Sequence, residues 1–171
     1  MNIEKLKGFY ERLYFAENEK KDKINNKIQM IFGLLMIEAT VVTYLFKNTS
    51  FKHHEIFAFI VIALAYVSVC FIFYVCFFLK KAFWGNEFKY IPKPDDINKY
   101  YIDLVNYEVT YKQFCKDNEM DYDGEYSSSK KINEYLITQL VECTSWNTKV
   151  NEVRTAQIYH ATKFFSSLYS R

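Results

Sequence analysis

Glycine and proline are scarce in this sequence, which contains four glycines and two prolines among 171 residues. A β-rich fold depends on these two residue types for its turns, so the composition favours long helices instead. The four cysteines include no CxxC pair, and two of them lie in the longest apolar run, so a disulfide framework is not expected. Neither charge sign dominates: 22 basic and 20 acidic residues leave a net charge of +2, so no global field attracts nucleic acid or anionic lipid.

Two long apolar runs are present. Residues 28–46 contain one ionisable side chain, Glu38, and residues 56–79 contain no Asp, Glu, Lys, Arg or His. At 1.5 Å per helical residue, each run is long enough for the ~30 Å hydrocarbon core of a bilayer. The polar first 27 residues, and the absence of a small-residue cleavage pattern after the first run, favour a retained span over a signal peptide. The alternative is a buried helical hairpin of a soluble protein.

Lysine and arginine set the expected orientation. Residues 8–27 and 80–99 carry five basic residues each, whereas the short connection 47–55 carries only Lys47 and Lys52. By the positive-inside rule, both termini are expected on the cytoplasmic side of the membrane.

The predicted organisation has three parts. Residues 1–27 form an N-terminal amphipathic helix whose apolar stripe is interrupted by the charged stretch 17–23. Residues 28–79 form the two-span hairpin, with spans 28–46 and 56–79. Residues 80–171 form a cytosolic helical region. It comprises a helix over 95–117 that Asp95 or Asp96 can cap, a polar loop over 118–129 and a long helix over 130–169 without glycine or proline.

The long helix carries a coiled-coil-like seam at spacings of three and four. Its members are Cys143, Trp146, Val150, Val153, Gln157, His160 and Phe164. Polar residues at such positions cost stability but fix register and oligomeric state. The seam predicts a homo-oligomer, and the alternative is packing within the subunit against residues 97–114.

Catalytic and metal-binding patterns are not found. No nucleophile with a base, phosphate-binding glycine loop or pair of carboxylates appears, so neither an enzyme nor a cofactor is expected. Reading the loop around Gly124 as a calcium site places Lys130 where the bidentate glutamate belongs. Basic residues along the long helix suggest a surface for an anionic ligand such as a nucleotide, and ordinary solvated lysines are the alternative. The residues concerned are Lys130, Lys131, Lys149, Arg154, Lys163 and the neighbouring Trp146.

Glu38 lies ten residues past Ile28, about 15 Å into the membrane and near its midplane. A charge that faces lipid at this depth costs roughly 2.5–3.5 kcal/mol, so Glu38 is expected to face helices or water. In one interpretation, copies of Glu38 ring a cation-favouring pore that Thr43 extends. In the other, a protonated Glu38 donates a hydrogen bond to Tyr66 or Ser68 on the second span.

The arrangement resembles the SLATT family, the SMODS- and SLOG-associating two-transmembrane effectors of prokaryotic conflict systems. The resemblance rests on the two closely joined spans and on residues of the flanking helices, which are Phe9, Tyr10, Glu11, Arg12, Tyr14, Ala16, Asn151, Arg154 and Ala161. It implies a pore-forming effector of the prokaryotic inner membrane that acts in antiphage defence, depolarises the membrane and is encoded beside a nucleotidyltransferase. One version is the channel subunit of a Hailong-type system, controlled by a nucleotide or a short single-stranded oligonucleotide made by that enzyme.

The sequence therefore predicts an all-α, two-span membrane protein that contacts lipid and assembles through its cytosolic helices, with a tetramer as the expected closure. Its expected function is ion conduction. The alternative is a membrane-anchored scaffold whose long helix recruits a soluble partner.

Overall fold

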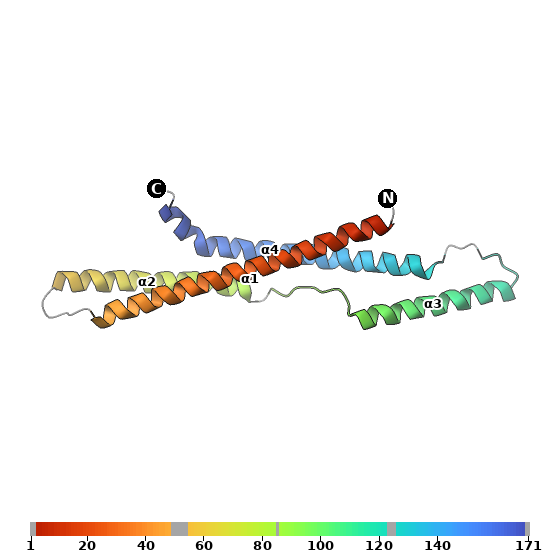
Figure 1. Ribbon diagram of the computed structural model, residues 1–171, viewed down its shortest axis with the longest axis horizontal. Helices are drawn as coiled ribbons and strands as arrows, with labels where there is room; N and C mark the ends of the chain where they lie inside the picture. Colours follow the sequence, from red (N-terminus) through yellow and green to blue (C-terminus); the bar gives the residue numbers. More distant parts are fainter. Residues whose placement is uncertain (1–2, 49–54, 85, 123–125, 170–171) are drawn as a thin grey trace. The chain divides into compact units, whose positions relative to one another are not determined.

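The computed structural model describes residues 3–48, 55–84, 86–122 and 126–169, which form four α-helices and contain no strand (Figure 1). The helices are α1 (Ile3–Asn48), α2 (Glu55–Phe83), α3 (Pro94–Asp117) and α4 (Ser128–Tyr169). The all-α prediction is confirmed. Contacts divide the chain into a first unit, Met1–Asn18 with Phe88–Lys149, and a second unit, Glu19–Glu87 with Val150–Arg171.

The first helix is longer than the separate elements predicted from the sequence. α1 is continuous through residues 27 and 28, where we expected a boundary between an amphipathic helix and a span. The charged stretch 17–23 does not interrupt it. Glu17 and Lys21 are half-buried and continue the spacing of three and four between Tyr14 and Ile24. Long charged side chains can do this because their aliphatic stems cover apolar surface while the charge stays in water.

The second unit is held together by a seam between α1 and α2, which run side by side in opposite directions (Figure 1). We call this contact the hairpin seam. Its buried members recur at spacings of three and four and are Ile24, Ile28, Ile31 and Leu35 on α1 with Val75, Leu79 and Ala82 on α2. This spacing keeps one face of each helix toward the other, as in antiparallel coiled coils. Ile158 and Ala161 of α4 complete the same cluster.

α1 and α2 are both long and apolar enough to cross a membrane. In the most apolar window of each helix, only 17% and 6% of the residues are buried. The core hairpin of a soluble protein would be mostly buried, so these values favour helices whose outer surfaces meet lipid. Trp84, one residue past α2, is 75% exposed and has the amphipathic character of a membrane-interface anchor.

The first unit contains a smaller core of Tyr14, Leu140 and Cys143, with Tyr10 and Ile91 packed against it. Within the described residues of α3, only Cys115 is buried. Most of the apolar surface of α3 therefore stays uncovered in the single chain.

The ends of α3 and α4 differ slightly from prediction. α3 starts with Pro94 in its first turn, where the missing N–H costs nothing. Its N-cap is Lys93 and has no side-chain cap, so neither Asp95 nor Asp96 caps the helix as expected. Both lie in the first turn, where negative charge complements the helix dipole. α4 begins at Ser128, two residues before the predicted start.

Replacing Leu79 by Ala should destabilise the hairpin by about 2 kcal/mol, because the fully buried side chain leaves a cavity in the seam. We expect the low end of the usual range, since detergent and not water surrounds the separated helices in the assay below. Unfolding in detergent micelles by titration with a denaturing detergent measures the change. Leu64→Ala, on the same helix but 63% exposed, is the control and should change stability by less than about 0.5 kcal/mol. Equal effects of the two substitutions would contradict the seam.

Candidate functional site

The apolar part of α1 carries a row of mostly polar or small residues on a side turned away from the hairpin seam. All are exposed and recur at spacings of three and four: Gln29, Gly33, Met36, Thr40, Thr43 and Lys47. We call this set the polar stripe. Leu35 of the seam and Thr40 of the stripe are five residues apart, which turns them about 140° from each other around the helix. A third face of α1 carries only large exposed apolar side chains, namely Met30, Leu34, Ile37, Val41 and Leu45.

A shallow groove follows the polar stripe. It has a volume of about 370 Å³, and its lining residues are Met36, Ala39, Thr40, Thr43, Tyr44 and Lys47. The hydroxyl of Thr40 donates to the Met36 carbonyl at 2.8 Å, and that of Thr43 donates to the Ala39 carbonyl at 2.8 Å. Each hydroxyl therefore satisfies its donor within the helix and keeps acceptor capacity toward the groove.

Thr43 also lines a second, larger groove between α1 and α2. This groove has a volume of about 600 Å³ and is mostly apolar, with Val42, Thr43, Phe46, Lys47, Ile62, Ala65, Tyr66 and Val69 around it. Thr43 and Lys47 thus lie where the polar stripe meets the edge of the hairpin.

Gly33 has no packing role within its own chain. A Cβ atom at this position would meet no atom within 4 Å. Glycine in a helix interior costs roughly 0.5–1 kcal/mol relative to alanine, so the fold alone does not favour it here. Between membrane helices, small residues let a second helix approach closely. Gly33 therefore fits a stripe that faces other copies of α1 or a narrow space between them.

Glu38 lies on a different face from Thr43. It is half-buried, and it follows Leu35 by three residues and precedes the half-buried Val42 by four, so it extends the hairpin seam. The two residues predicted to share a pore lining are five apart, about 140° around the helix. Thr43 therefore lies on the polar stripe, and Glu38 lies on the half-buried face of α1 that continues the hairpin seam.

The residues of α2 that lie at the same depth as Glu38 can be found by counting from Asn25 on α1 and Ala82 on α2. These two residues share a level because Arg154 bonds to both. Glu38 is 13 residues beyond Asn25, and Ser68 is 14 residues before Ala82. Both are therefore about 20 Å from that common level. Ser68 is half-buried on the seam side, whereas Tyr66 is 71% exposed and lines the larger groove. The described residues show no hydrogen bond from Glu38 to either, but the depth favours Ser68 as its neighbour.

Arg154 of α4 has a structural role, because its side chain bonds to the last turn of α2. It is 3% exposed, its Nε donates to the Ala82 carbonyl at 2.8 Å, and its Nη2 donates to Asn25 Oδ1 at 2.6 Å. The last carbonyls of a helix lack partners within the helix and carry partial negative charge, so a guanidinium there fills an orphan acceptor. Burial lowers the pKa of Arg154 below its ordinary value, because desolvation penalises the charged form.

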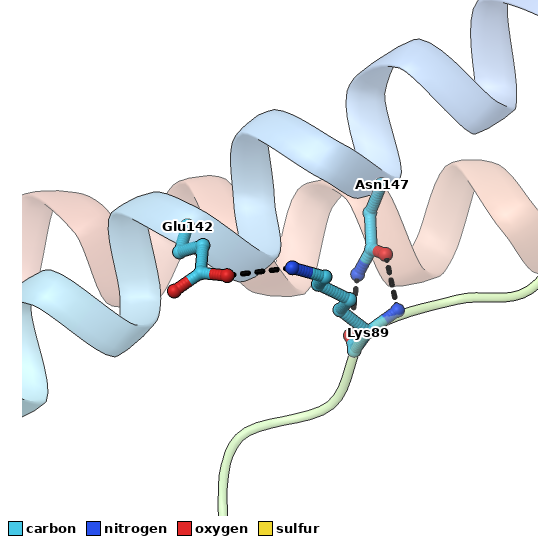
Figure 2. A network of polar contacts seen from close by, with 3 residues as sticks. All are labelled: Lys89, Glu142 and Asn147. Carbon is cyan, nitrogen blue, oxygen red and sulfur yellow. Dashed lines mark hydrogen bonds and ion pairs between the residues drawn. The ribbon is translucent and has the colours of Figure 1, made fainter.

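In the first unit, Asn147 ties the segment before α3 to α4 (Figure 2). Its side chain is fully buried, accepts from the Lys89 backbone N–H at 2.9 Å and donates to the Lys89 carbonyl at 2.9 Å. The Lys89 ammonium pairs with Glu142 at 2.5 Å and lies 5.2 Å from the centre of the Trp146 ring. Lys89, which lies outside the helices, is thereby held by α4 through both its backbone and its side chain.

The N-terminus of α4 already has a negative partner. Glu108 of α3 accepts from the Ser128 backbone N–H at 2.8 Å and from the Lys112 ammonium at 2.6 Å. The Lys112 hydrogen bond and then the Ser128 bonds hold the Glu108 pKa at about 2. The charge that a helix N-terminus attracts is therefore supplied from within the chain.

Tyrosine rings gather around this contact. Tyr107 stacks on Tyr111 with centroids 6.2 Å apart, and Tyr126 lies 4.9 Å from Tyr107. Tyr122 lies 6.0 Å from Tyr111 and donates a short hydrogen bond to the Tyr126 carbonyl. Burial is the main cause of a raised pKa at Tyr126.

Within the first unit, the residues predicted to bind an anion are spread along α4. In the first unit, Lys131 pairs with Glu134 at 3.5 Å, and 18 residues of helix separate it from Lys149, about 27 Å. Trp146 packs against Lys89. The remaining members are Lys130, which is exposed in the first unit, and Arg154 and Lys163 in the second. Because Arg154 is buried against Ala82, its side chain is not presented to a ligand.

The predicted seam of α4 differs by one residue from the face that the chain buries on itself. In the second unit the buried positions are Asn151, Arg154, Ile158 and Ala161. Val150 is also buried, at 8% exposed, while Val153 is 50% exposed and His160 is exposed with its ring 5.5 Å from that of Phe78. Gln157 is half-buried, and the side chain of Phe164 lies outside the described residues. Val153 and His160 therefore remain accessible to a second copy.

Sequence reasoning missed the polar stripe and the two polar anchors, Asn147 and Arg154. A signal for each was present. The residues of the stripe recur in the first apolar run at spacings of three and four, the same spacing that marks the seam. Asn147, Asn151 and Arg154 follow that spacing too, but polar residues were counted only where they interrupted an apolar pattern. Compared with known proteins, the chain matches no family model, no curated protein and no solved structure.

Asn147→Ala should destabilise the first unit by roughly 1–3 kcal/mol, because it leaves the Lys89 N–H and carbonyl without their partner. Thermal unfolding in detergent, followed by the near-ultraviolet signal of the tyrosines, reports the loss. Asn133→Ala is the control, since its amide donates only to the Ser129 carbonyl of its own helix. An equal loss of thermal stability in the control would contradict a specific role for the Asn147 hydrogen bonds.

Proposed function

We propose that several copies of this chain assemble in a membrane into an ion-conducting pore, with the polar stripe of α1 facing the water-filled path. The observation that carries the proposal is that α1 divides its membrane surface into three faces. One packs on α2, one is wholly apolar, and one carries Gln29, Thr40, Thr43 and Lys47 in an exposed row.

The first face is covered by α2 and the apolar face suits lipid, but the polar stripe suits neither. Polar side chains in hydrocarbon are costly and are normally found facing a protein interior or water. α2 offers no comparable row, since its exposed large side chains are predominantly Ile, Leu, Val and Phe. α1 is therefore the lining helix of the proposed pore, and α2 is the outer helix that meets lipid.

One hairpin cannot enclose water, because its two helices pack directly on each other through the seam. The pore needs several copies, and a ring is the natural closure of identical contacts. The uncovered apolar surface of α3 and the exposed Val153 and His160 of α4 supply surfaces for assembly. A tetramer remains our working arrangement for this ring. The basic-residue count supports the orientation with both termini in the cytoplasm.

Control by a nucleotide or short oligonucleotide, and a role in antiphage defence beside a nucleotidyltransferase, rest on the SLATT resemblance alone. The scattered basic residues of α4 add no support for a particular binding site.

Thiol accessibility separates a pore lining from a dry or lipid-facing surface. In a background without the four native cysteines, Thr40→Cys should react with a charged water-soluble thiol reagent, and the current across a planar bilayer should change. Val41→Cys is the matched control: it is the next residue, 50% exposed in the single chain, and lies on the apolar face. It should not respond, because the reagent does not enter lipid.

If neither cysteine responds while currents flow, the polar stripe is a dry contact between subunits. If Val41→Cys responds and Thr40→Cys does not, the lining is assigned to the wrong face. A silent bilayer together with a stable complex with a soluble partner would support the membrane-anchored scaffold instead.

Glu38→Gln tests the other predicted pore residue. Because Glu38 extends the hairpin seam, removing its charge should leave ion selectivity and conductance unchanged while preserving assembly. Reversal potentials in a salt gradient, with particle mass in detergent as the check on assembly, measure this. A shift of the reversal potential with an unchanged particle mass would show that Glu38 lines the pore.

A further inference from the structure

We propose that Met36 forms the hydrophobic gate of the pore, a ring of thioether side chains that keeps the path dry in the closed state. The inference rests on the proposed function, because it assigns regulation to the same stripe. It concerns a residue that sequence reasoning did not single out.

Met36 is the only large apolar member of the polar stripe. On its inner side lie Gln29 and Gly33, and on its outer side lie Thr40, Thr43 and Lys47. The exposed Phe32 lies beside this row, about 40° from Met36 around the helix, and the row itself is polar or open at every level except that of Met36. Met36 is 67% exposed and lines the same groove as Thr40, Thr43 and Lys47, so it points to the stripe side and not into the hairpin.

Its depth suits a gate. Met36 is eight residues past Ile28, about 12 Å into the ~30 Å hydrocarbon core, so its ring lies near the middle of the membrane. A constriction of apolar side chains stops ions by losing its water, without a charged or bulky plug. Methionine suits this task, because its unbranched side chain has three rotatable bonds and adapts to a small change in the radius of the ring.

The neighbours of Met36 allow such a change. Gly33, one turn inward, has open space around its Cβ position, so side chains of Met36 can move toward that level without a clash in their own chain. Thr40, one turn outward, donates its hydroxyl to the Met36 carbonyl, and α1 is one continuous helix through this stretch. The adjustable part of the lining is therefore the Met36 side chain and not the backbone.

The test replaces Met36 by Ser and compares it with the same change at Met30. The two methionines share a helix and nearly the same exposure, 67% and 63%, but Met30 lies on the apolar face. Protein reconstituted into planar bilayers without any added ligand is recorded at fixed voltage. Met36→Ser should raise the resting current by about tenfold or more, because hydroxyls hold water where thioethers exclude it. Met30→Ser and the apolar Met36→Leu should resemble the parent.

Particle mass and unfolding midpoint in detergent must stay unchanged in all three variants, which an exposed position predicts. A resting current of Met36→Ser equal to that of the parent overturns the gate while leaving the pore intact. Equal leakage in Met36→Ser and Met30→Ser also overturns it, since the effect then follows from general loosening. If Met36→Ser and the parent are both silent under every condition, the pore itself is wrong and the gate falls with it.

Discussion

The contact between α1 and α2 is the interaction on which the other features of this molecule depend. Side chains spaced three and four apart on each helix keep a single face of α1 turned toward α2 from Ile24 to Leu35. Once that face is fixed, the positions of all remaining side chains around α1 follow from helix geometry. The polar stripe and the apolar face are therefore consequences of the seam, and so is the placement of Glu38 on the seam side of α1.

The polar anchors outside the apolar seam solve a different problem. Where a helix ends or an irregular segment passes a helix, backbone groups need partners that the local structure does not supply. Arg154 supplies one at the Ala82 carbonyl, and Asn147 supplies two at Lys89. A buried guanidinium has a large desolvation cost, and strong hydrogen bonds to a helix end and to Asn25 offset it. Such residues resemble ligand-binding residues in a sequence because both uses require charge and hydrogen-bond donors.

The proposed pore and the scaffold alternative make different demands on α1. A scaffold needs only spans that are stable in lipid, and a wholly apolar surface would serve it best. The exposed Gln29, Thr40, Thr43 and Lys47, together with a glycine that has no packing role in its own chain, are unnecessary for an anchor. They are useful where helices from several copies approach one another around water. This difference is why the pore is the better-supported function.

The helical class, the two apolar helices and almost the whole length of α4 could be predicted from the sequence alone, because scarcity of glycine and proline and runs of apolar residues act locally along the chain. The continuity of α1 through residues 27 and 28 could not, because an amphipathic helix followed by an apolar run gives the same sequence pattern with or without a break between them. The seam predicted on α4 is a contact between copies, and the face that the second unit buries on the same helix, at Asn151, Arg154, Ile158 and Ala161, lies one residue away from it. The sequence did not reveal this second face, because a one-residue shift turns a helix by about 100° and an amphipathic pattern with polar members fits both faces. The angle of about 140° between Glu38 and Thr43 follows from their spacing of five residues in a helix, but only the packing of α1 on α2 shows that Glu38 is the one that continues the hairpin seam.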